Sequence, residues 1–488
     1  MTLHKLIQAL HDFRTPPIEN PDIISIEMDS RAVVPGSLFV CIKGYTVDGH
    51  DYIQQAIDRG AVAIVAQKDV DASVPVIKVN DTMRTLAILA NAFYENPSEN
   101  LHMIGVTGTN GKTSVTHLIE DILRQYGQKT GLIGTIGLKI GDDVFETKNT
   151  TPDALVLQKM LRQMQDARVD SAIMEVSSHA LHIGRVHGCR YDVAVFTNLT
   201  QDHLDYHVTM DNYRAAKSLL FSQLGNGYDV SRPKYAILNV DDEATKEYIV
   251  ATQAIIMTYG IDNDADLMAR DILTTSSGTT FTLITAGGSY QVKMGLVGKF
   301  NVYNILAAIG ATLATGVPID VIIGCIKKTK GVPGRFQLVD GGQDFNIIVD
   351  YAHTPDSLEN VLKTIRAITQ QNIYCIIGCG GDRDKTKRPI MAKIASELSD
   401  VPIFTSDNPR TEDPLAILAD MEKGVTHQTY HSIVDRRDAI DRAIRHAKAG
   451  DVVLIAGKGH ENYQIIGEKV LDFDDVEMAL KAVEKRYN

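Results

Sequence analysis

A lysine and a threonine close a glycine-rich segment whose composition suits phosphate binding. The segment GVTGTNGKTSVTHLIEDIL runs from Gly105 to Leu123, with Gly111, Lys112 and Thr113 near its centre. In a phosphate loop, backbone N–H groups bind phosphate oxygens, the lysine contacts the β- and γ-phosphates, and the threonine hydroxyl coordinates Mg²⁺. The usual loop has four residues between its first glycine and the Gly-Lys pair, whereas five separate Gly105 from Gly111. The sequence therefore predicts a nucleotide site of a variant kind.

The residues around this segment have the order that a phosphate loop requires. An apolar run ends at Val106, and after Thr113 apolar residues recur at helical spacing, namely at Val115, Leu118, Ile119, Ile122, Leu123 and Tyr126. A strand, a glycine-rich turn and a helix N-terminus therefore follow one another, and the helix dipole favours phosphate there. An incidental glycine-rich turn is the alternative, and the Gly-Lys-Thr ending makes it the weaker one.

Seven short apolar runs each end in a polar cluster. The first three are MIGV, SAIM and DVAVFT, and they lead into TGTNGKT, Glu175 with its neighbours, and NLTQDHLDYH. The other four are FNIIV, IYCIIG, VPIFTS and DVVLIA, and they lead into DYAH, CGGDRD, DNPR and GKGHE. Amphipathic helices alternate with these runs, which predicts parallel α/β sheets. Because ligands bind beyond the carboxyl ends of such strands, we expect a cleft between two domains.

Lys217 lies on the apolar face of a predicted helix. In DNYRAAKSLLFSQL it shares that face with Tyr213, Ala216, Leu220, Phe221 and Leu224. A lysine in this position can extend past the apolar residues and keep its ammonium in water. If it is buried instead, its pKa falls, which favours the neutral amine. The neutral amine is the form that can be carbamylated.

Length and composition limit the remaining possibilities. The chain has 488 residues, which suggests about three domains, and its net charge of −12 disfavours nucleic-acid binding. We expect no signal peptide and no membrane-spanning segment. The five cysteines are scattered without zinc spacing, and YCIIGC is typical of a buried strand. We therefore expect a cytoplasmic protein that binds neither nucleic acid nor membrane.

Six motifs together resemble the Mur ligase family and its folylpolyglutamate synthase relatives. They are GVTGTNGKT, MEVSSHAL, TNLTQDHLDYH, GKFNVYNILAA, GVPGRFQ and VDYAHTPDSL, and the N-terminal MDSRAVVPGSLFVCIKG resembles the uridine-nucleotide domain of Mur ligases. The resemblance implies a three-domain α/β fold: a UDP-sugar domain at 1–98, a central P-loop ATPase-type parallel sheet at 99–331, and a Rossmann-like amino-acid domain at 332–488. The turn-rich ENPSEN and KTKGVPGRF segments are the expected linkers. We expect a monomer.

The resemblance implies an ATP-dependent, ADP-forming ligase that works through an acyl phosphate. Catalytic roles fall on Lys112, Glu175, His203 and Lys217, and Mg²⁺ would be bound by Thr113, Glu175, His203 and a carbamylated Lys217. ATP would contact Gly108, Thr109, Asn110, Gly111, Lys112, Thr113, Ser114, Asn301, Asn304, Arg335 and Asp350.

The resemblance also implies two further substrates, UDP-MurNAc-L-Ala-D-Glu and an amino acid. Residues matched to the UDP substrate are Ser30, Asn149, Thr150, Thr151, Ser177 and Arg185, although Ile183 stands where some relatives have glutamine. Residues matched to the amino acid are Arg383, Asp407, Asn408, Pro409, Arg410, Gly457 and Glu461. Family members that add meso-diaminopimelate carry Asp-Asn-Pro-Arg here, whereas those that add lysine lack the arginine. Diaminopimelate has a second carboxylate, which a guanidinium can bind in bidentate geometry. Without that carboxylate, the charge of a buried Arg410 would be left uncompensated.

Three alternatives stay open. The same ligase could add L-lysine, or the chain could be a folylpolyglutamate synthase-type ligase. That enzyme shares the ATP residues but lacks the N-terminal module and the DNPR cluster. A P-loop switch or motor would hydrolyse nucleotide without joining two substrates, and it would not need the polar clusters of the third domain.

Overall fold

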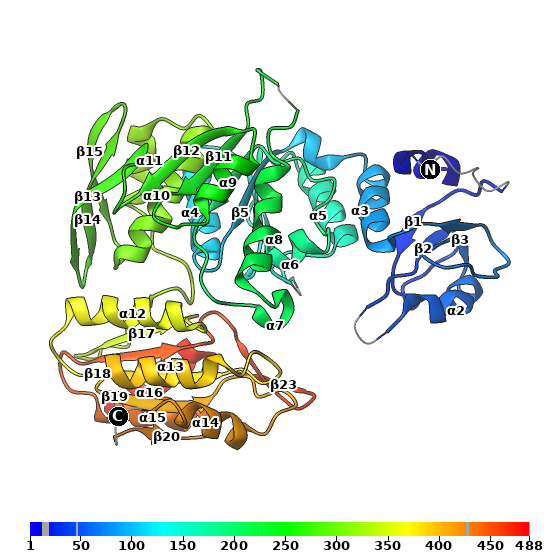
Figure 1. The fold of residues 1–488 in the computed structure, drawn as a ribbon. Coiled ribbons are helices and arrows are strands. Elements are labelled where there is room, and N and C mark those ends of the chain that lie inside the picture. The colour runs from blue at the N-terminus through cyan, green and yellow to red at the C-terminus, as the bar shows by residue number, and fades with distance from the viewer. Residues whose placement is uncertain (12–18, 45–46, 148, 228, 426–428, 488) are drawn as a thin grey trace.

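Three sheets follow one another along the chain in the computed structural model. The structure describes residues 1–11, 19–44, 47–147, 149–227, 229–425 and 429–487. In Figure 1 the N-terminal sheet lies at one end, the largest sheet lies in the centre, and the C-terminal sheet lies below the central one. The α/β prediction is confirmed, because helices cover sheets that are parallel at their centres.

The N-terminal part is a small parallel sheet with strand order β1-β2-β3-β4. The sequence of β3, AVAIVA, is almost wholly buried, as expected for a strand covered on both faces. Its elements are α1 (Leu3–Ile7), β1 (Ser25–Glu27), β2 (Ser37–Val40), α2 (Ile53–Asp58), β3 (Ala61–Ala66), β4 (Val76–Lys78) and α3 (Thr82–Phe93).

The expected linker ENPSEN is a packed turn. Pro97 and Ser98 are buried in a 3₁₀ turn, Pro97–Asn100. The Ser98 hydroxyl donates to the Gly188 carbonyl and accepts from the Arg190 amide. Tertiary contacts therefore bury the middle of this connection between α3 and β5.

The central sheet has eleven strands in the order β15-β14-β13-β12-β11-β10-β5-β9-β6-β7-β8. The strands from β13 to β6 are parallel, and antiparallel strands extend both ends. The strands are β5 (His102–Thr107), β6 (Thr130–Gly134), β7 (Gly137–Ile140), β8 (Asp143–Phe145), β9 (Ser171–Glu175), β10 (Val193–Phe196), β11 (Tyr235–Asn239), β12 (Ile255–Gly260), β13 (Leu267–Thr275), β14 (Gly278–Thr285) and β15 (Gly288–Met294).

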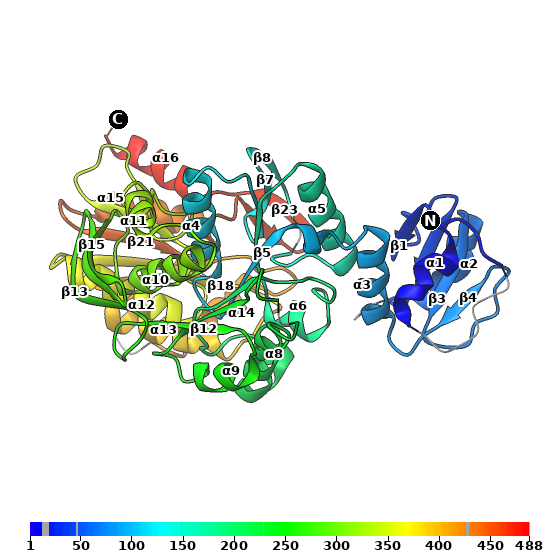
Figure 2. The same ribbon diagram turned by 90° about the horizontal axis from the view of Figure 1, so that it is seen from above.

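Helices pack on both faces of the central sheet (Figure 2). They are α4 (Lys112–Gln125), α5 (Ala154–Asp166), α6 (Ser178–His182), α7 (Leu204–His207), α8 (Met210–Ser222), α9 (Thr245–Ala251), α10 (Lys299–Ala314) and α11 (Ile319–Ile326). The predicted helix after the phosphate loop is confirmed as α4, and its apolar residues face the core. Tyr126 is the exception to the prediction: it lies just after the helix and is 44% exposed.

The C-terminal sheet has the order β16-β17-β21-β18-β19-β20, parallel except at β16. The elements are β16 (Gln337–Val339), β17 (Asn346–Asp350), α12 (Pro355–Ile368), β18 (Ile373–Cys379), α13 (Lys387–Leu398), β19 (Val401–Ser406), α14 (Pro414–Glu422), β20 (His431–Ser432), α15 (Arg436–His446), β21 (Val452–Ala456), the hairpin β22 (Tyr463–Ile466) and β23 (Lys469–Asp472), and α16 (Asp475–Tyr487).

The cysteine prediction agrees with the structure. YCIIGC forms the buried β18, and all five cysteines are free thiols. Within the described ranges, no helix combines the length and apolar character needed to span a bilayer.

A buried ion cluster closes the amino-terminal edge of the central sheet. Asp192 is fully buried, and its carboxylate accepts from Arg232, from Lys234 at 2.5 Å and from the Met103 amide at 2.8 Å. Burial alone would raise the pKa of Asp192, but the hydrogen bonds from Arg232 and Lys234 outweigh burial and lower it. The ionised carboxylate therefore stabilises the fold.

Replacing this carboxylate by an amide should destabilise the central part. We expect Asp192→Asn to reduce the free energy of unfolding by about 3 kcal/mol at neutral pH, because two largely buried cations lose their anion. Since the folded-state pKa is depressed, the wild-type advantage is complete above the unfolded pKa and shrinks as pH falls through acidic values. Urea denaturation at several pH values measures both effects. Equal stability of the two proteins at neutral pH would contradict the assignment.

Candidate active site

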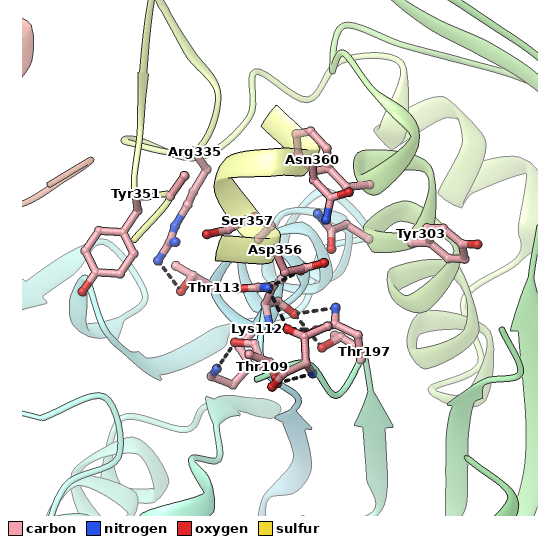
Figure 3. Close-up of a pocket in the computed structure, with 18 of the residues that line it drawn as sticks. Thr109, Lys112, Thr113, Thr197, Tyr303, Arg335, Tyr351, Asp356, Ser357 and Asn360 are labelled. Atoms are coloured by element: carbon pink, nitrogen blue, oxygen red, sulfur yellow. Dashed lines mark hydrogen bonds between the residues drawn. The ribbon is translucent and has the colours of Figure 1, made fainter. Parts of the chain in front are cut away.

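Strand ends of the central and C-terminal sheets meet at one cavity of about 520 Å³. Figure 3 shows part of its lining. The phosphate-loop side contributes Thr109 to Ser114 and Glu175, and the C-terminal side contributes Arg335, Asp350 and the start of α12. The predicted cleft is thereby confirmed for the ends of β5, β9, β10 and β17. The clusters after β18, β19 and β21 are not part of its lining.

Two glycines let the phosphate loop approach its neighbours closely. Gly108 and Gly111 have φ of 151° and 88°, values that suit glycine. A Cβ on Gly108 would overlap the Thr197 hydroxyl, and one on Gly111 would lie 2.6 Å from Asn304 Oδ1. Asn198 holds the loop by accepting from the amides of Thr109 and Asn110. The sequence analysis did not single out Asn198, although it lies in the TNLTQDH motif.

Two lysines donate to the same carbonyl oxygen. The distances to Gly108 O are 2.9 Å from Lys112 Nζ and 2.7 Å from Lys217 Nζ. Lys217 is 1% exposed and its Nζ lies 4.3 Å from the Tyr213 ring centre, so its ammonium does not reach water. Burial, together with the charge of Lys112, lowers the pKa of Lys217 well below its ordinary value. Burial also lowers the pKa of Lys112.

Glu175 is a buried carboxylate bonded to neutral donors. It is 1% exposed and accepts from the Thr113 hydroxyl at 3.0 Å and from the amide and hydroxyl of Thr135. Within the described ranges, no lysine, arginine or histidine nitrogen lies within ion-pair distance of it. A buried carboxylate beside a threonine hydroxyl fits a divalent cation with oxygen ligands. Neither here nor elsewhere in the described residues do three or more His, Cys, Asp or Glu side chains form a group that could hold a metal ion.

The C-terminal part reaches across the cavity to the phosphate loop. Arg335 donates to the Thr113 hydroxyl at 3.0 Å and its guanidinium lies 4.4 Å from the Tyr351 ring centre. Asn110 donates to the Asp356 carboxylate at 2.8 Å. Asp350 accepts from the Phe336 amide at 2.6 Å, and burial raises its pKa to about 6 against the effect of Arg335.

His203 also lines this cavity, on a loop held by aromatic contacts. Its backbone is left-handed (φ 54°), its ring lies 4.9 Å from the ring of His179, and its Nε2 is 3.3 Å from Asp202. Burial lowers the pKa of His203, although Asp202 opposes this shift. The structure therefore brings His203 and Glu175 to one cavity.

The two asparagines predicted to lie near adenine occupy different positions. Asn304 lines the cavity and donates to Asn301 Oδ1 at 3.2 Å. Asn301 lies behind it, buried, and donates to the Val297 carbonyl. Asn301 thus orients Asn304 and is not itself in the lining.

Four of the six residues predicted to bind the UDP substrate cluster beside Glu175, and two of them, Thr150 and Ser177, line the cavity. The Thr151 hydroxyl donates to the Glu175 carbonyl and accepts from the Ser177 amide, and Arg185 donates to the Thr151 carbonyl. Thr150 bonds Thr135. Asn149 is exposed beside them. Ser30 lies apart, after β1 in the N-terminal part, where its buried hydroxyl donates to Gln55. Ile183 is a half-buried residue at the end of α6.

The predicted amino-acid residues form a second polar cluster. Asn408 donates to Glu461 at 2.9 Å, and Gly457 approaches Asp407 so closely that a Cβ would lie 2.8 Å from its carboxylate. Pro409 is buried next to them. Lys458 also belongs to this cluster but was not among the predicted residues. Its buried Nζ donates to Asn408 and Glu461. It stands inside the GKGHE motif, and a lysine between two glycines after a buried strand was the available signal.

The expected environment of Arg410 requires correction. Arg410 is half-buried, not buried without a partner, because it donates to the Gly381 carbonyl at 2.8 Å. It does not protrude from a turn tip either: its amide donates to Ile465 at the edge of β22. Arg383 is exposed and donates to the adjacent Asp382 carbonyl. Exposure and carbonyl partners both reduce the cost of leaving these guanidinium groups without a ligand.

Comparisons with known proteins cover nearly the whole chain. Sequence models of the Mur ligase middle domain, of the Mur ligase glutamate ligase domain and of the Mur ligase family catalytic domain match residues 106–312, 334–459 and 22–94, respectively. UDP-N-acetylmuramoyl-L-alanyl-D-glutamate–2,6-diaminopimelate ligase of Bacillus cereus is 60% identical over 488 residues, covering 100% of this chain and 99% of that protein. The enzyme of the same name from Bacillus licheniformis is 61% identical, with 95% of each chain covered.

A solved structure of a protein with that name agrees. It is 34% identical, covers 100% of both chains and has a TM-score of 0.70. Sequence identity of this extent, together with the phosphate loop facing Arg335 across the cavity, establishes that the chain belongs to the Mur ligase family.

Proposed function

We propose that this protein is an ATP-dependent, ADP-forming ligase that joins meso-diaminopimelate to UDP-N-acetylmuramoyl-L-alanyl-D-glutamate in peptidoglycan precursor synthesis. The main observation in support is the contact of Arg335 with Thr113 across the cavity, because it places a cation from the C-terminal part at the phosphate loop. The names of the relatives at 60% and 61% identity support these substrates.

The proposed reaction has two steps. A carboxylate of the UDP-linked peptide attacks the γ-phosphorus of ATP, which gives an acyl phosphate and ADP. The amino group of the amino acid then attacks the acyl carbon, a tetrahedral intermediate forms, and phosphate departs. Both steps gather anions in one place, so the site must supply cations and exclude water.

Lys112 and Arg335 are suited to hold the phosphates. Both border the cavity, one from each side, and neither is paired with a carboxylate in the described residues. Lys112 now donates to the carbonyls of Gly108 and Thr109, and phosphate oxygens are stronger acceptors that would replace them. Asn304 would then face the adenine side, and Asp350 the ribose side.

Mg²⁺ would be held by Thr113, Glu175, His203 and a carbamylated Lys217, and it would offset the negative charge of the phosphates. Glu175 supports this assignment because it is buried and lacks an ion-pair partner among the described residues. The chain itself aligns the Glu175 carboxylate through the Thr135 amide and hydroxyl.

The environment of Lys217 supports carbamylation. Its ammonium lies beside that of Lys112, since both donate to the Gly108 carbonyl. A neutral amine can react with CO₂, releasing a proton and forming an N–C bond, and the product is an anion. The modification would thus turn a repulsive pair into an attractive one.

The remaining assignments are extensions of the same proposal. Thr150, Thr151, Ser177 and Arg185 would contact the UDP-linked peptide, and Ser30 the uridine side. We also infer three functional domains at 1–98, 99–331 and 332–488, a monomer, and a cytoplasmic location. The full-length similarity to ligases disfavours a folylpolyglutamate synthase or a P-loop switch.

The nucleotide product tests the reaction class. We expect ADP and phosphate in equal amounts, and turnover that requires both the UDP-linked peptide and the amino acid. Lys112→Ala should lower kcat by about three orders of magnitude, because a phosphate-binding cation is lost. The exposed Lys129→Ala is the matched control and should behave as wild type. AMP as the stoichiometric product would refute the mechanism.

Two substitutions test the carbamate. Lys217→Ala should be nearly inactive, and small carboxylic acids should restore part of its activity by supplying the missing anion. Lys217→Arg keeps a cation but cannot be carbamylated, so it should also be inactive. Activity is measured together with the intact mass of the wild-type protein, which should include one CO₂. Full activity of an unmodified protein would disprove the role.

A panel of amino acids tests the substrate. We expect meso-diaminopimelate to be preferred over L-lysine, and Arg410→Ala to raise KM for diaminopimelate about tenfold to hundredfold while KM for ATP changes little. The half-buried position of Arg410 argues for this moderate effect. Arg410→Lys should recover part of the loss, because it keeps the charge without the two-pronged geometry. A wild-type preference for L-lysine would show that the DNPR motif has another role.

A further inference from the structure

Lys458 is a fully buried lysine to which the proposed reaction assigns no role. Its side chain is 0% exposed, directly after β21. Its Nζ lies 3.3 Å from Asn408 Oδ1, 3.3 Å from Glu461 Oε2 and 4.0 Å from Asp407 Oδ1. All three partners belong to the proposed amino-acid site.

The two carboxylates beside Lys458 differ in their bonding. Both carboxylate oxygens of Glu461 already accept hydrogen bonds. One accepts from Asn408 and Lys458, and the other accepts from the Tyr351 hydroxyl. Asp407 is about 8% exposed, and within the described ranges its carboxylate accepts no hydrogen bond. Asp407 is therefore the carboxylate with free acceptor capacity.

Other charged and titratable groups surround this cluster from every packed element. Arg436 faces Asp407 and Glu461 from α15, but it is already paired with Asp475. The others are His460 next to Glu461, Tyr351 after β17, Cys379 at the end of β18, Tyr463 on β22, Arg335, and Arg410 and Arg383 near Gly380. Lys458 Nζ lies within 4.0 Å of both carboxylates, so its charge offsets one of their two negative charges.

We propose that Lys458 is a positioning residue that sets the charge of the amino-acid site, neutralising Glu461 and orienting Asn408 so that Asp407 remains as the one carboxylate available to a ligand ammonium. This inference rests on the proposed function and adds the chemical basis of its specificity. The site selects an amino acid whose distal end carries an ammonium in addition to the carboxylate that Arg410 would bind.

The charge of Lys458 should also favour the ionised form of Glu461. Burial raises the pKa of Glu461, Asp407 adds to that effect, and Lys458 opposes it. Without this cation the pKa of Glu461 should rise further. A protonated Glu461 accepts more weakly from Asn408, so the variant should hold an ammonium poorly near neutral pH, and raising the pH should restore binding.

Kinetics with the full-length enzyme test the inference through KM for meso-diaminopimelate as a function of pH. Lys458→Gln keeps a hydrogen-bond donor but removes the charge, and Lys458→Met removes both. In both variants KM should be about tenfold or more above wild type at neutral pH and should fall toward wild type as pH rises. KM for ATP should not follow this trend. Lys458→Arg keeps the charge and should retain the wild-type pH profile.

The matched control is Lys234→Gln. Lys234 is also a buried lysine bound to a carboxylate, but it lies at Asp192, in the central part. It should lower the melting temperature without moving the pH profile of KM. In wild type, 2-aminopimelate, which lacks the distal ammonium, should bind at least tenfold more weakly than diaminopimelate.

The outcomes separate this inference from the proposed function. If wild type does not use diaminopimelate at all, the proposed function fails. If wild type uses it and a folded Lys458→Gln or Lys458→Met variant keeps the wild-type pH profile of KM, only the role of Lys458 is overturned. If both neutral variants fail to fold, a shifted profile in Lys458→Arg overturns it, because that variant retains the charge.

Discussion

The Gly108 carbonyl oxygen is the point on which the active-site geometry depends. Lys112 and Lys217 both donate to it, one from the start of α4 and the other from α8. Two ammonium groups on one acceptor can be held only if anions lie nearby or one lysine loses its charge. Burial of Lys217 prevents water from screening the pair. The phosphate loop is therefore arranged for incoming negative charge.

The same electrostatic requirement explains why the site needs two sheets. Parallel strands leave their carboxyl ends at one edge, where loops present polar groups. β5 and β9 bring the phosphate loop and Glu175 together, while β17 brings Asp350 and the loop after it to the opposite wall. The contacts of Arg335 with Thr113 and of Asn110 with Asp356 join the two walls. The cavity is thus lined by cations from both walls, Lys112 from one and Arg335 from the other.

In the cluster of residues predicted to bind the amino acid, the negative charges outnumber the positive one. There, carboxylates are buried and a single lysine compensates one of them. Asn408 links the two strand-end loops because it bonds Glu461, Lys458 and the Ile465 amide. Arg388 stabilises the same region, because its fully buried guanidinium binds Glu412, two residues after Arg410. The two buried cations of this region, Lys458 and Arg388, thus each have a carboxylate partner within the described residues.

The sequence alone determined the local features of the protein. Glycines before a Gly-Lys-Thr ending, apolar runs and helical spacing predicted the phosphate loop, β5 and α4, because these depend on neighbouring residues and on backbone preferences. Motif order also indicated which strand ends carry polar groups. Only the tertiary structure decided burial and partners. Lys217 on an apolar face was compatible with an exposed or a buried ammonium, and packing of α8 buried it. Arg410 was expected to be buried, but in the structure it is half-buried and donates to the Gly381 carbonyl. Lys458 and Asn198 were overlooked, because their importance comes from residues far away in sequence, which only folding brings within hydrogen-bond distance.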